Sequence, residues 1–215
     1  MRRVVTIDGP AGAGKSTVAR TLAERLNWRL LDTGAMYRAV TVAALRAGVD
    51  LESDEALTLL AGAVTVRLPP GRVLLDGEDI SALVRGVEVT RASRHLADSP
   101  GVRRQLVAWQ RAFATEYDVI AEGRDQGTVV FPDAFRKFYL VASDEERARR
   151  RHAEFVARGE SITLPEVLDD LLARDAADAT VIDTTGMSLD EVVGHMEREV
   201  LDRLGQSGSV PGGPS

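Results

Sequence analysis

The segment that most constrains the fold of this chain is Gly9-Pro10-Ala11-Gly12-Ala13-Gly14-Lys15-Ser16, which fits the pattern G-x-x-x-x-G-K-[ST]. It follows a short β-branched run, Val4–Asp8, and precedes apolar residues at helical spacing over Ser16–Leu26. A loop between a strand and a helix N-terminus offers free backbone N–H groups and the positive end of the helix dipole to an anion. The segment therefore predicts a phosphate-binding loop in an α/β protein.

Lysine is rare in this chain, because only Lys15 and Lys137 are lysines among 27 Lys and Arg residues. A compact ammonium can reach between two phosphates, where the planar guanidinium of Arg would fit poorly. We therefore predict that backbone N–H groups around Gly12–Lys15 hold the β-phosphate of ATP and that Lys15 contacts the β and γ oxygens. The Ser16 hydroxyl is the predicted Mg²⁺ ligand.

The composition excludes several classes of protein. There is no Cys, and His95, His152 and His195 are too scattered to form a metal site. No apolar stretch approaches the roughly 20 residues that span a bilayer. The short leader Met1–Arg3 leaves no room for a signal peptide, so we expect a cytoplasmic protein without a membrane partner. The net charge of −6 argues against binding a nucleic acid polymer.

Strand and helix patterns alternate along most of the chain, which predicts a parallel sheet flanked by helices. The predicted strands are Val4–Asp8, Trp28–Leu31, Asp118–Glu122, Arg136–Val141 and Thr180–Asp183. The predicted helices that accompany them are Ser16–Leu26, about Ala35–Ala47, about 54–63 after a Ser53 cap, Asp144–Ala157, Leu164–Ala173 and Leu189–Leu204.

The middle of the chain interrupts this alternation. Residues 64–77 read as an antiparallel hairpin around Pro69-Pro70-Gly71, and helices follow at about Val87–Ala97 and Gly101–Phe113. We interpret this block as an inserted subdomain that grips a substrate.

A first group of candidate binding residues is Thr33, Tyr37 and Arg38, at and just after a helix N-terminus. Two hydroxyls and a guanidinium gathered there could hold the phosphate of a second substrate. The alternative is a helix cap followed by a half-buried Tyr and a solvated Arg.

A second group follows the strand that ends at Glu122. Ligands in open α/β sheets bind outside the carboxyl ends of the strands, so Arg124 and Asp125 are predicted to face the cleft. Arg124 could hold a phosphate and Asp125 could accept a hydrogen bond from an amino group. A structural ion pair in a tight turn is the alternative.

A third group lies in the Arg-rich helix that begins near Asp144. Pairs Glu145–Arg149 and Glu146–Arg150 at i,i+4 spacing explain part of it as a solvated face. This helix and the residues just after it contain more arginines than these two pairs use. The excess favours a lid that closes on ATP and excludes water. The arginines are Arg147, Arg149, Arg150, Arg151 and Arg158.

Taken together, these motifs resemble the bacterial-type cytidylate kinases of the nucleoside-monophosphate (NMP) kinase family. The resemblance rests on IDGPAGAGKST (Ile7–Thr17), LLDTGAMYR (Leu30–Arg38), PGVR (Pro100–Arg103), EGRDQGTVVFPDA (Glu122–Ala134) and SDEERARRR (Ser143–Arg151). It implies the NMP-kinase fold as a single kinase domain over 1–204. The core would comprise 1–35, 114–145 and 179–204, the NMP-binding insertion about 36–113 and the lid about 146–178, followed by a disordered tail over 205–215.

The resemblance also implies ATP-dependent phosphorylation of CMP and dCMP with Mg²⁺, by a protein that is usually monomeric. ATP would be bound by the loop Gly9, Pro10, Ala11, Gly12, Ala13, Gly14, Lys15, Ser16 and Thr17. The acceptor nucleotide would be held by Thr33, Tyr37, Arg38, Arg103, Arg124, Asp125, Arg174 and Asp178. Residues with a direct catalytic role would be Lys15, Arg124, Arg150 and Arg151, with Arg150, Arg151 and Arg174 in the lid.

The chain departs from the family after Arg174. The family has the pattern R-D-x-x-D-x-x-R and then a Pro-containing linker before the last strand. Here the pattern begins at Arg174-Asp175, Val181 stands where its last Arg is expected, and about a dozen residues are missing before the strand. Asp178 fits either the second Asp of the motif or the Asp before the last strand. Since the family's last Arg helps to recognise cytosine, the choice between CMP and UMP stays open. A smaller departure is Arg94, where the family often has a Ser.

Three other functions are compatible with parts of this pattern. A kinase of this fold for a shikimate-like or sugar acceptor would need a smaller cap than the insertion of roughly 50 residues. A regulatory GTPase would need an N-K-x-D motif, and the chain's only Asn, Asn27, precedes Trp28. The third is a protein that still binds ATP but no longer catalyses a reaction, because its lid is shortened.

Overall fold

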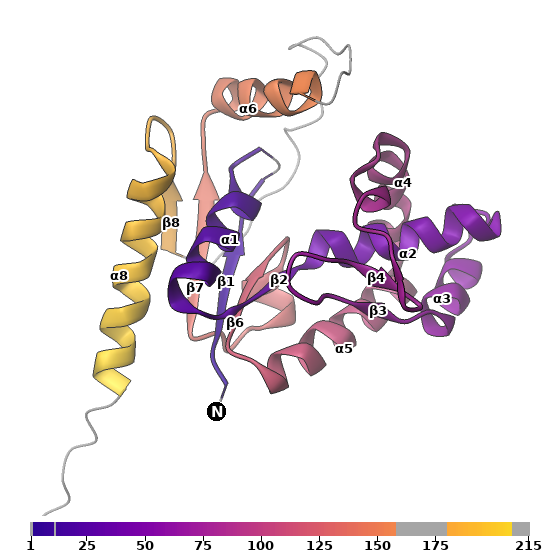
Figure 1. The fold of residues 1–215 in the computed structure, drawn as a ribbon, viewed down its shortest axis with the longest axis horizontal. Coiled ribbons are helices and arrows are strands. Elements are labelled where there is room, and N and C mark those ends of the chain that lie inside the picture. The colour runs from indigo at the N-terminus through magenta and orange to yellow at the C-terminus, as the bar shows by residue number, and fades with distance from the viewer. Residues whose placement is uncertain (1, 11, 158–179, 208–215) are drawn as a thin grey trace, which may run out of the picture.

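The parallel sheet predicted from the sequence is the centre of the molecule. The computed structural model describes residues 2–10, 12–157 and 180–207. Within them, five parallel strands pair in the order β2-β6-β1-β7-β8 (Figure 1). Their bounds are β1 (Val4–Asp8), β2 (Arg29–Asp32), β6 (Val119–Glu122), β7 (Arg136–Val141) and β8 (Thr180–Asp183).

Alternation along the strands separates two hydrophobic cores, one on each face of the sheet. Val5 and Ile7 of β1 and Ile120 of β6 pack with buried residues of α1 (Lys15–Leu26) and α8 (Leu189–Ser207). Val119 and Ala121 of β6 instead join the core formed with α2, α3, α4 and α5. Because successive strand residues point to opposite faces, the same short strand serves both cores.

The segment predicted to be an insertion forms several helices and a second, three-stranded sheet, which share a small core. Its helices and short strands are α2 (Thr33–Ala47), α3 (Asp54–Ala63), β3 (Val66–Arg67), β4 (Leu74–Leu75), β5 (Glu78–Asp79), the 3₁₀-helix η1 (Leu83–Arg85), α4 (Val87–Asp98) and α5 (Pro100–Glu116). The predicted hairpin is present as β3 and β4, and β5 adds a third antiparallel strand. Ser53 and Ser99 cap α3 and α5 as their sequence positions predict.

The remaining elements are the π-helix η2 (Gln126–Val130), which the sequence did not indicate, and α6 (Asp144–Ala157), whose bounds match the prediction. The predicted helix over Leu164–Ala173 lies outside the described residues. At the other end, α8 continues to Ser207, so Gly205–Ser207 are helical instead of belonging to the predicted disordered tail. Within the described ranges, no helix is long and apolar enough to cross a membrane.

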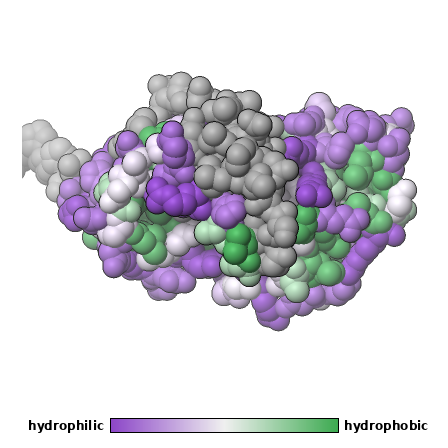
Figure 2. Space-filling view, turned by 90° about the horizontal axis from the view of Figure 1, so that it is seen from above, coloured by the Kyte–Doolittle hydropathy of each residue, from purple (hydrophilic) through white to green (hydrophobic). Residues whose placement is uncertain are grey.

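The surface is mixed in character. Hydrophilic residues make up much of the face in Figure 2, and hydrophobic residues gather towards the end that carries α2, α3 and α4. Single exposed apolar side chains such as Leu59 and Leu83 belong to this insertion. Scattered exposed apolar residues are ordinary on a protein surface and need no special explanation.

The packing of α5 on α3 gives a test of this fold. A Cβ added at Gly101 would lie 2.7 Å from Thr58 Cβ and 2.8 Å from Thr58 Cγ2. We therefore expect Gly101→Ala to lower the free energy of unfolding by about 1–3 kcal/mol, the usual cost of overpacking. Urea unfolding followed by circular dichroism measures it.

Gly62→Ala in α3 is the matched control, because nothing lies within 4 Å of its added Cβ. Replacing a helical Gly by Ala should leave stability unchanged or raise it by up to about 1 kcal/mol. Equal effects of the two variants would contradict the packing described.

Candidate active site

The predicted phosphate-binding loop joins β1 to α1 at the carboxyl edge of the sheet. Gly9, Gly12 and Gly14 all have positive φ angles, of 140°, 82° and 90°, a region that residues with a Cβ rarely adopt. No side chain caps the N-terminus of α1, and its first turn has no acidic residue. The loop thus presents a helix N-terminus to an anion, as the sequence predicted. Ala11 lies outside the described residues.

Lys15 and Ser16 begin α1, and their side chains have different partners. The Lys15 ammonium donates to the Pro10 carbonyl over 2.9 Å, so it lies across the loop. The Ser16 hydroxyl donates to Glu122 Oε1 over 2.9 Å. A hydroxyl beside a carboxylate is the kind of hard oxygen group that Mg²⁺ prefers, so these residues fit the predicted metal site.

Glu122 ends β6 beside the loop and is only 5% exposed. The pKa of Glu122 is raised to about 7, mainly by burial and then by the nearby Asp32 carboxylate, against the opposing effects of Lys15, Ser16 and Arg38. Strand pairing places Asp32 directly opposite Glu122. Sequence reasoning noted Glu122 only as the end of a strand and did not identify its contact with Ser16.

The residues at the start of α2 also lie at the carboxyl edge of the sheet, next to Glu122. Asp32, not Thr33, caps the helix by accepting from the Ala35 N–H over 2.7 Å, and it lies 3.6 Å from Arg38. Thr33 is buried and donates to the Glu122 carbonyl over 2.8 Å. Arg38 remains accessible beside the carboxyl edge of β2.

Tyr37, Arg103 and Asp125 come together from three separate elements. Arg103 of α5 and Asp125, just before η2, form an ion pair at 3.0 Å. Burial raises the pKa of Tyr37, the charge of Arg103 lowers it and the charge of Asp125 raises it, so Tyr37 lies near both charged groups. Arg124 is exposed in the same turn. The predicted acceptor residues that the structure describes therefore lie near one edge of the sheet.

Arg150 of α6 reaches the phosphate-binding loop, where its guanidinium donates to the Ala13 carbonyl over 3.5 Å. Arg150 pairs with Glu146 at 2.7 Å, as predicted, and also donates to the hydroxyl and carbonyl of Thr184, each over 3.2 Å. Arg149 pairs with Glu146 at 2.6 Å, not with the predicted Glu145. Arg151 belongs to the same helix, whereas Arg158, Arg174 and Asp178 lie outside the described residues.

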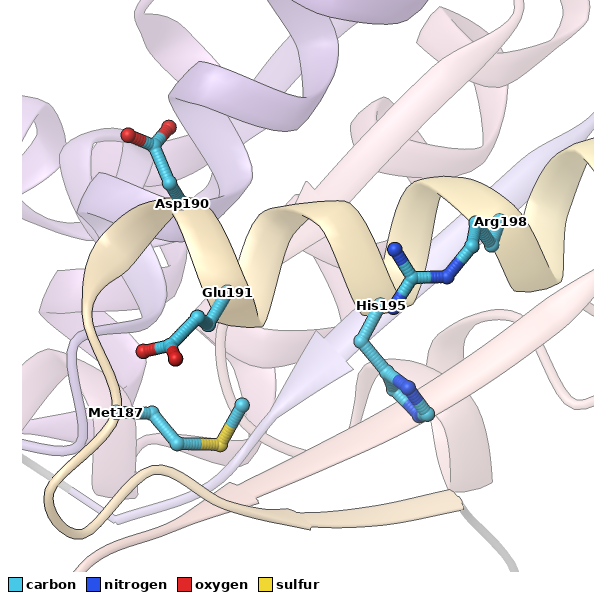
Figure 3. A pocket seen from close by; sticks show the side chains of 5 residues that line it. All are labelled: Met187, Asp190, Glu191, His195 and Arg198. Carbon is cyan, nitrogen blue, oxygen red and sulfur yellow. The ribbon is translucent and has the colours of Figure 1, made fainter.

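A surface depression of about 500 Å³ lies elsewhere, on α8. Met187, Glu191 and His195 point to one side of this helix and Asp190 to the other (Figure 3). Asp190 pairs with Arg25 of α1 at 2.5 Å. No residue of the predicted site lines this depression, so it is separate from the loop.

Comparisons with family models and with known sequences point to the same protein family. A family model described as cytidylate kinase matches residues 5–201. A cytidylate kinase of Shewanella amazonensis is 43% identical, with 95% of this chain and 97% of the relative covered. One from Pseudomonas savastanoi pv. phaseolicola is also 43% identical, with coverages of 93% and 96%. An uncharacterized protein from Eubacterium ventriosum has a TM-score of 0.50 at 10% identity, covering 93% of this chain and 98% of that protein, which shows the fold alone.

The fold and the loop define a P-loop kinase. Within that class, this chain belongs to the cytidylate kinase family, as its motifs indicated. The Shewanella alignment spans 224 positions, nine more than the 215 residues of the chain, so the relative carries residues that this chain lacks.

The raised pKa of Glu122 predicts a pH dependence of stability. The folded state holds this proton more tightly than the unfolded chain, so its stabilising effect is complete below pH 4.5 and is lost as the pH rises through about 7. Relative to Glu122→Gln, which cannot ionise, the native protein should lose on the order of 1–3 kcal/mol of unfolding free energy over this interval.

Urea unfolding at a series of pH values, with EDTA and without nucleotide, measures this difference. Glu116→Gln on exposed α5 surface is the control, and it should follow the native protein at every pH. Parallel pH profiles of the native protein and Glu122→Gln would contradict the environment assigned to Glu122.

Proposed function

We propose that this chain transfers the γ-phosphate of ATP to CMP and dCMP, producing ADP and the nucleoside diphosphates. The observation that supports this function is that two groups of predicted binding residues lie at one edge of the sheet. One is the loop with Lys15 and Ser16, and the other is the cluster around Tyr37, Arg103 and Asp125. Family membership over nearly the whole chain supports the nucleotide acceptor.

The proposed reaction is a direct in-line transfer. An ionised oxygen of the CMP phosphate forms a bond to the γ-phosphorus, and the bond from that phosphorus to the bridging oxygen of ADP breaks. The attacking oxygen is already charged, so the reaction needs no general base. The protein's work is to position both phosphates and to stabilise the charge that spreads in the transition state.

The predicted residues on the two sides of the site have different parts in this positioning. The loop N–H groups and Lys15 would hold the β and γ phosphates. Arg38 and Arg124 would hold the phosphate of the acceptor, with Arg103 and Asp125 beside the nucleotide. Arg150, whose guanidinium lies 3.5 Å from the Ala13 carbonyl, would bring α6 against ATP.

Mg²⁺ would supply charge neutralisation between the phosphates when bound. The Ser16 hydroxyl would be its protein ligand, and Glu122 would orient that hydroxyl through the contact described above. Groups of three or more His, Cys, Asp or Glu that could hold a metal are absent from the described residues. The proposed ion would therefore depend on Ser16 and the substrate phosphates.

The insertion favours a nucleotide over a smaller acceptor. It supplies α2 to α5 and a separate three-stranded sheet, more structure than is needed to cover a compact acceptor such as shikimate or a sugar. The set of arginines and carboxylates that these elements bring to the sheet edge also suits a phosphorylated acceptor with a polar base.

The role of Lys15 gives the first test. Lys15→Ala should lower kcat/KM by at least about a hundredfold, as removal of a single transition-state donor does elsewhere. Lys15→Arg should also be impaired, since a planar fork replaces the point charge. A coupled assay of ADP release with CMP measures both, and circular dichroism checks the fold. A near-native rate for Lys15→Ala would refute the mechanism.

Arg38 gives a test of the acceptor side. Arg38→Ala should raise the KM for CMP by about tenfold or more, the loss expected for a charged hydrogen bond, and change the KM for ATP less than about twofold. Arg46→Ala is the matched control, because Arg46 lies on the same helix and pairs with exposed Glu78 at 2.7 Å. Equal loss for ATP and CMP would remove Arg38 from the acceptor site.

A further inference from the structure

Asp8 is a buried charge that the phosphate-binding loop does not use. It ends β1 and is 4% exposed, directly before Gly9. Alternation puts Val5 and Ile7 in the core with α1 and α8, so Thr6 and Asp8 point to the opposite face of the sheet. Buried carboxylates are rare unless they are hydrogen-bonded, and the partners of this one are informative.

Both oxygens of Asp8 accept from the start of η2. Oδ1 accepts from the Gln126 N–H over 2.9 Å, and Oδ2 accepts from the Gly127 N–H over 2.8 Å. The first N–H groups of a helix have no partner inside that helix. Here a carboxylate from a distant strand caps two of them with charge-assisted hydrogen bonds, which are stronger than neutral ones.

This cap fixes the residue that precedes it. Asp125 has a φ of 57°, in the left-handed region that is unfavourable for residues other than Gly. Its carbonyl accepts from the N–H groups of Val129 and Val130 over 2.9 and 3.1 Å. Its carboxylate is thereby aimed at Arg103, in the cluster proposed to hold the acceptor.

The turn is pressed against β1 as well as bonded to it. A Cβ added at Gly127 would lie 2.9 Å from Thr6 Oγ1 and 3.2 Å from Lys137 Cδ. Burial raises the pKa of Asp8, the two N–H groups oppose that rise, and Asp125 and Lys15 are the charges that act on it. Asp8 therefore lies between the ATP side and the acceptor side of the site.

We propose that Asp8 is a positioning residue for the acceptor nucleotide, which holds the 124–127 turn so that Arg124 and Asp125 face CMP. Because Asp8 is bonded to Gly9, the same residue fixes the distance between this turn and the ATP-binding loop. This inference rests on the proposed function, and it adds a residue that makes no contact of its own with either nucleotide.

Asp8→Asn tests the inference with little change in shape. The amide keeps one acceptor oxygen, but its NH₂ group must face the other backbone N–H. We expect the KM for CMP to rise at least about tenfold, as for a lost charged hydrogen bond, with the KM for ATP changed less than about twofold. Asp118→Asn, at the amino end of β6, is the matched control and should leave both constants unchanged.

A double-mutant cycle separates positioning from a general structural effect. If Asp8 acts through the turn, Asp8→Asn should raise the KM for CMP by a clearly smaller factor in an Asp125→Ala background than in the native protein, because only its effect on Arg124 remains. A full multiplicative effect there, or equal changes for ATP and CMP in the single variant, would overturn the proposal. Thermal unfolding of each variant shows whether the folded population has changed.

Gly127→Ala provides a second route if Asp8→Asn does not fold. It displaces the turn from β1 without altering a charge, and the same selective rise in the KM for CMP is expected. An unchanged KM for CMP in Gly127→Ala would count against the proposal. Absence of CMP phosphorylation by the native protein would instead refute the proposed function, so the two failures are distinguishable.

Discussion

The hydrogen bond from Ser16 to Glu122 joins the two halves of the site, and it depends on the parallel pairing of β1 with β6. That pairing sets Ile7 opposite Glu122, so the loop that follows β1 and the turn that follows β6 begin at the same edge of the sheet. Pairing of β2 with β6 adds Asp32 and the start of α2 to this edge. Backbone hydrogen bonds between the strands thus hold together three loops that are distant in sequence. The side chains of these loops can therefore contact one another over short distances.

The site contains four carboxylates next to its proposed phosphate positions, which poses an electrostatic problem. The charge of each carboxylate is offset by its own neighbours. Asp8 accepts hydrogen bonds from two backbone N–H groups, Asp32 caps α2 and lies near Arg38, and Asp125 pairs with Arg103. Glu122 keeps its proton more readily because burial and Asp32 raise its pKa. The negative charge near the proposed phosphate positions is therefore partly compensated, which supports the proposal that Lys15, Arg38 and Arg124 bind the substrates.

Local patterns were sufficient to predict most of the fold. Strand β7 and helix α6 have the predicted bounds, and the loop sequence alone located the start of α1 within one residue. Long-range contacts were not predictable in this way. Asp8 and Gln126 are 118 residues apart, and η2 is a short helix stabilised by that contact and not by its own propensity. The partner of Ser16 was missed for the same reason, although a lone charge ending the apolar run of β1 was a signal that Asp8 has a buried partner.

The most direct test of the account is to identify the product by ³¹P NMR after incubation with Mg-ATP and CMP, dCMP, UMP or AMP in parallel. The account predicts the phosphorus signals of CDP and dCDP together with ADP, formed in equal amounts and much faster than any product from AMP. The UMP reaction will show how far the residues present discriminate between pyrimidines without the family's last Arg. ATP binding without any acceptor product would contradict the assignment of this chain as a working kinase.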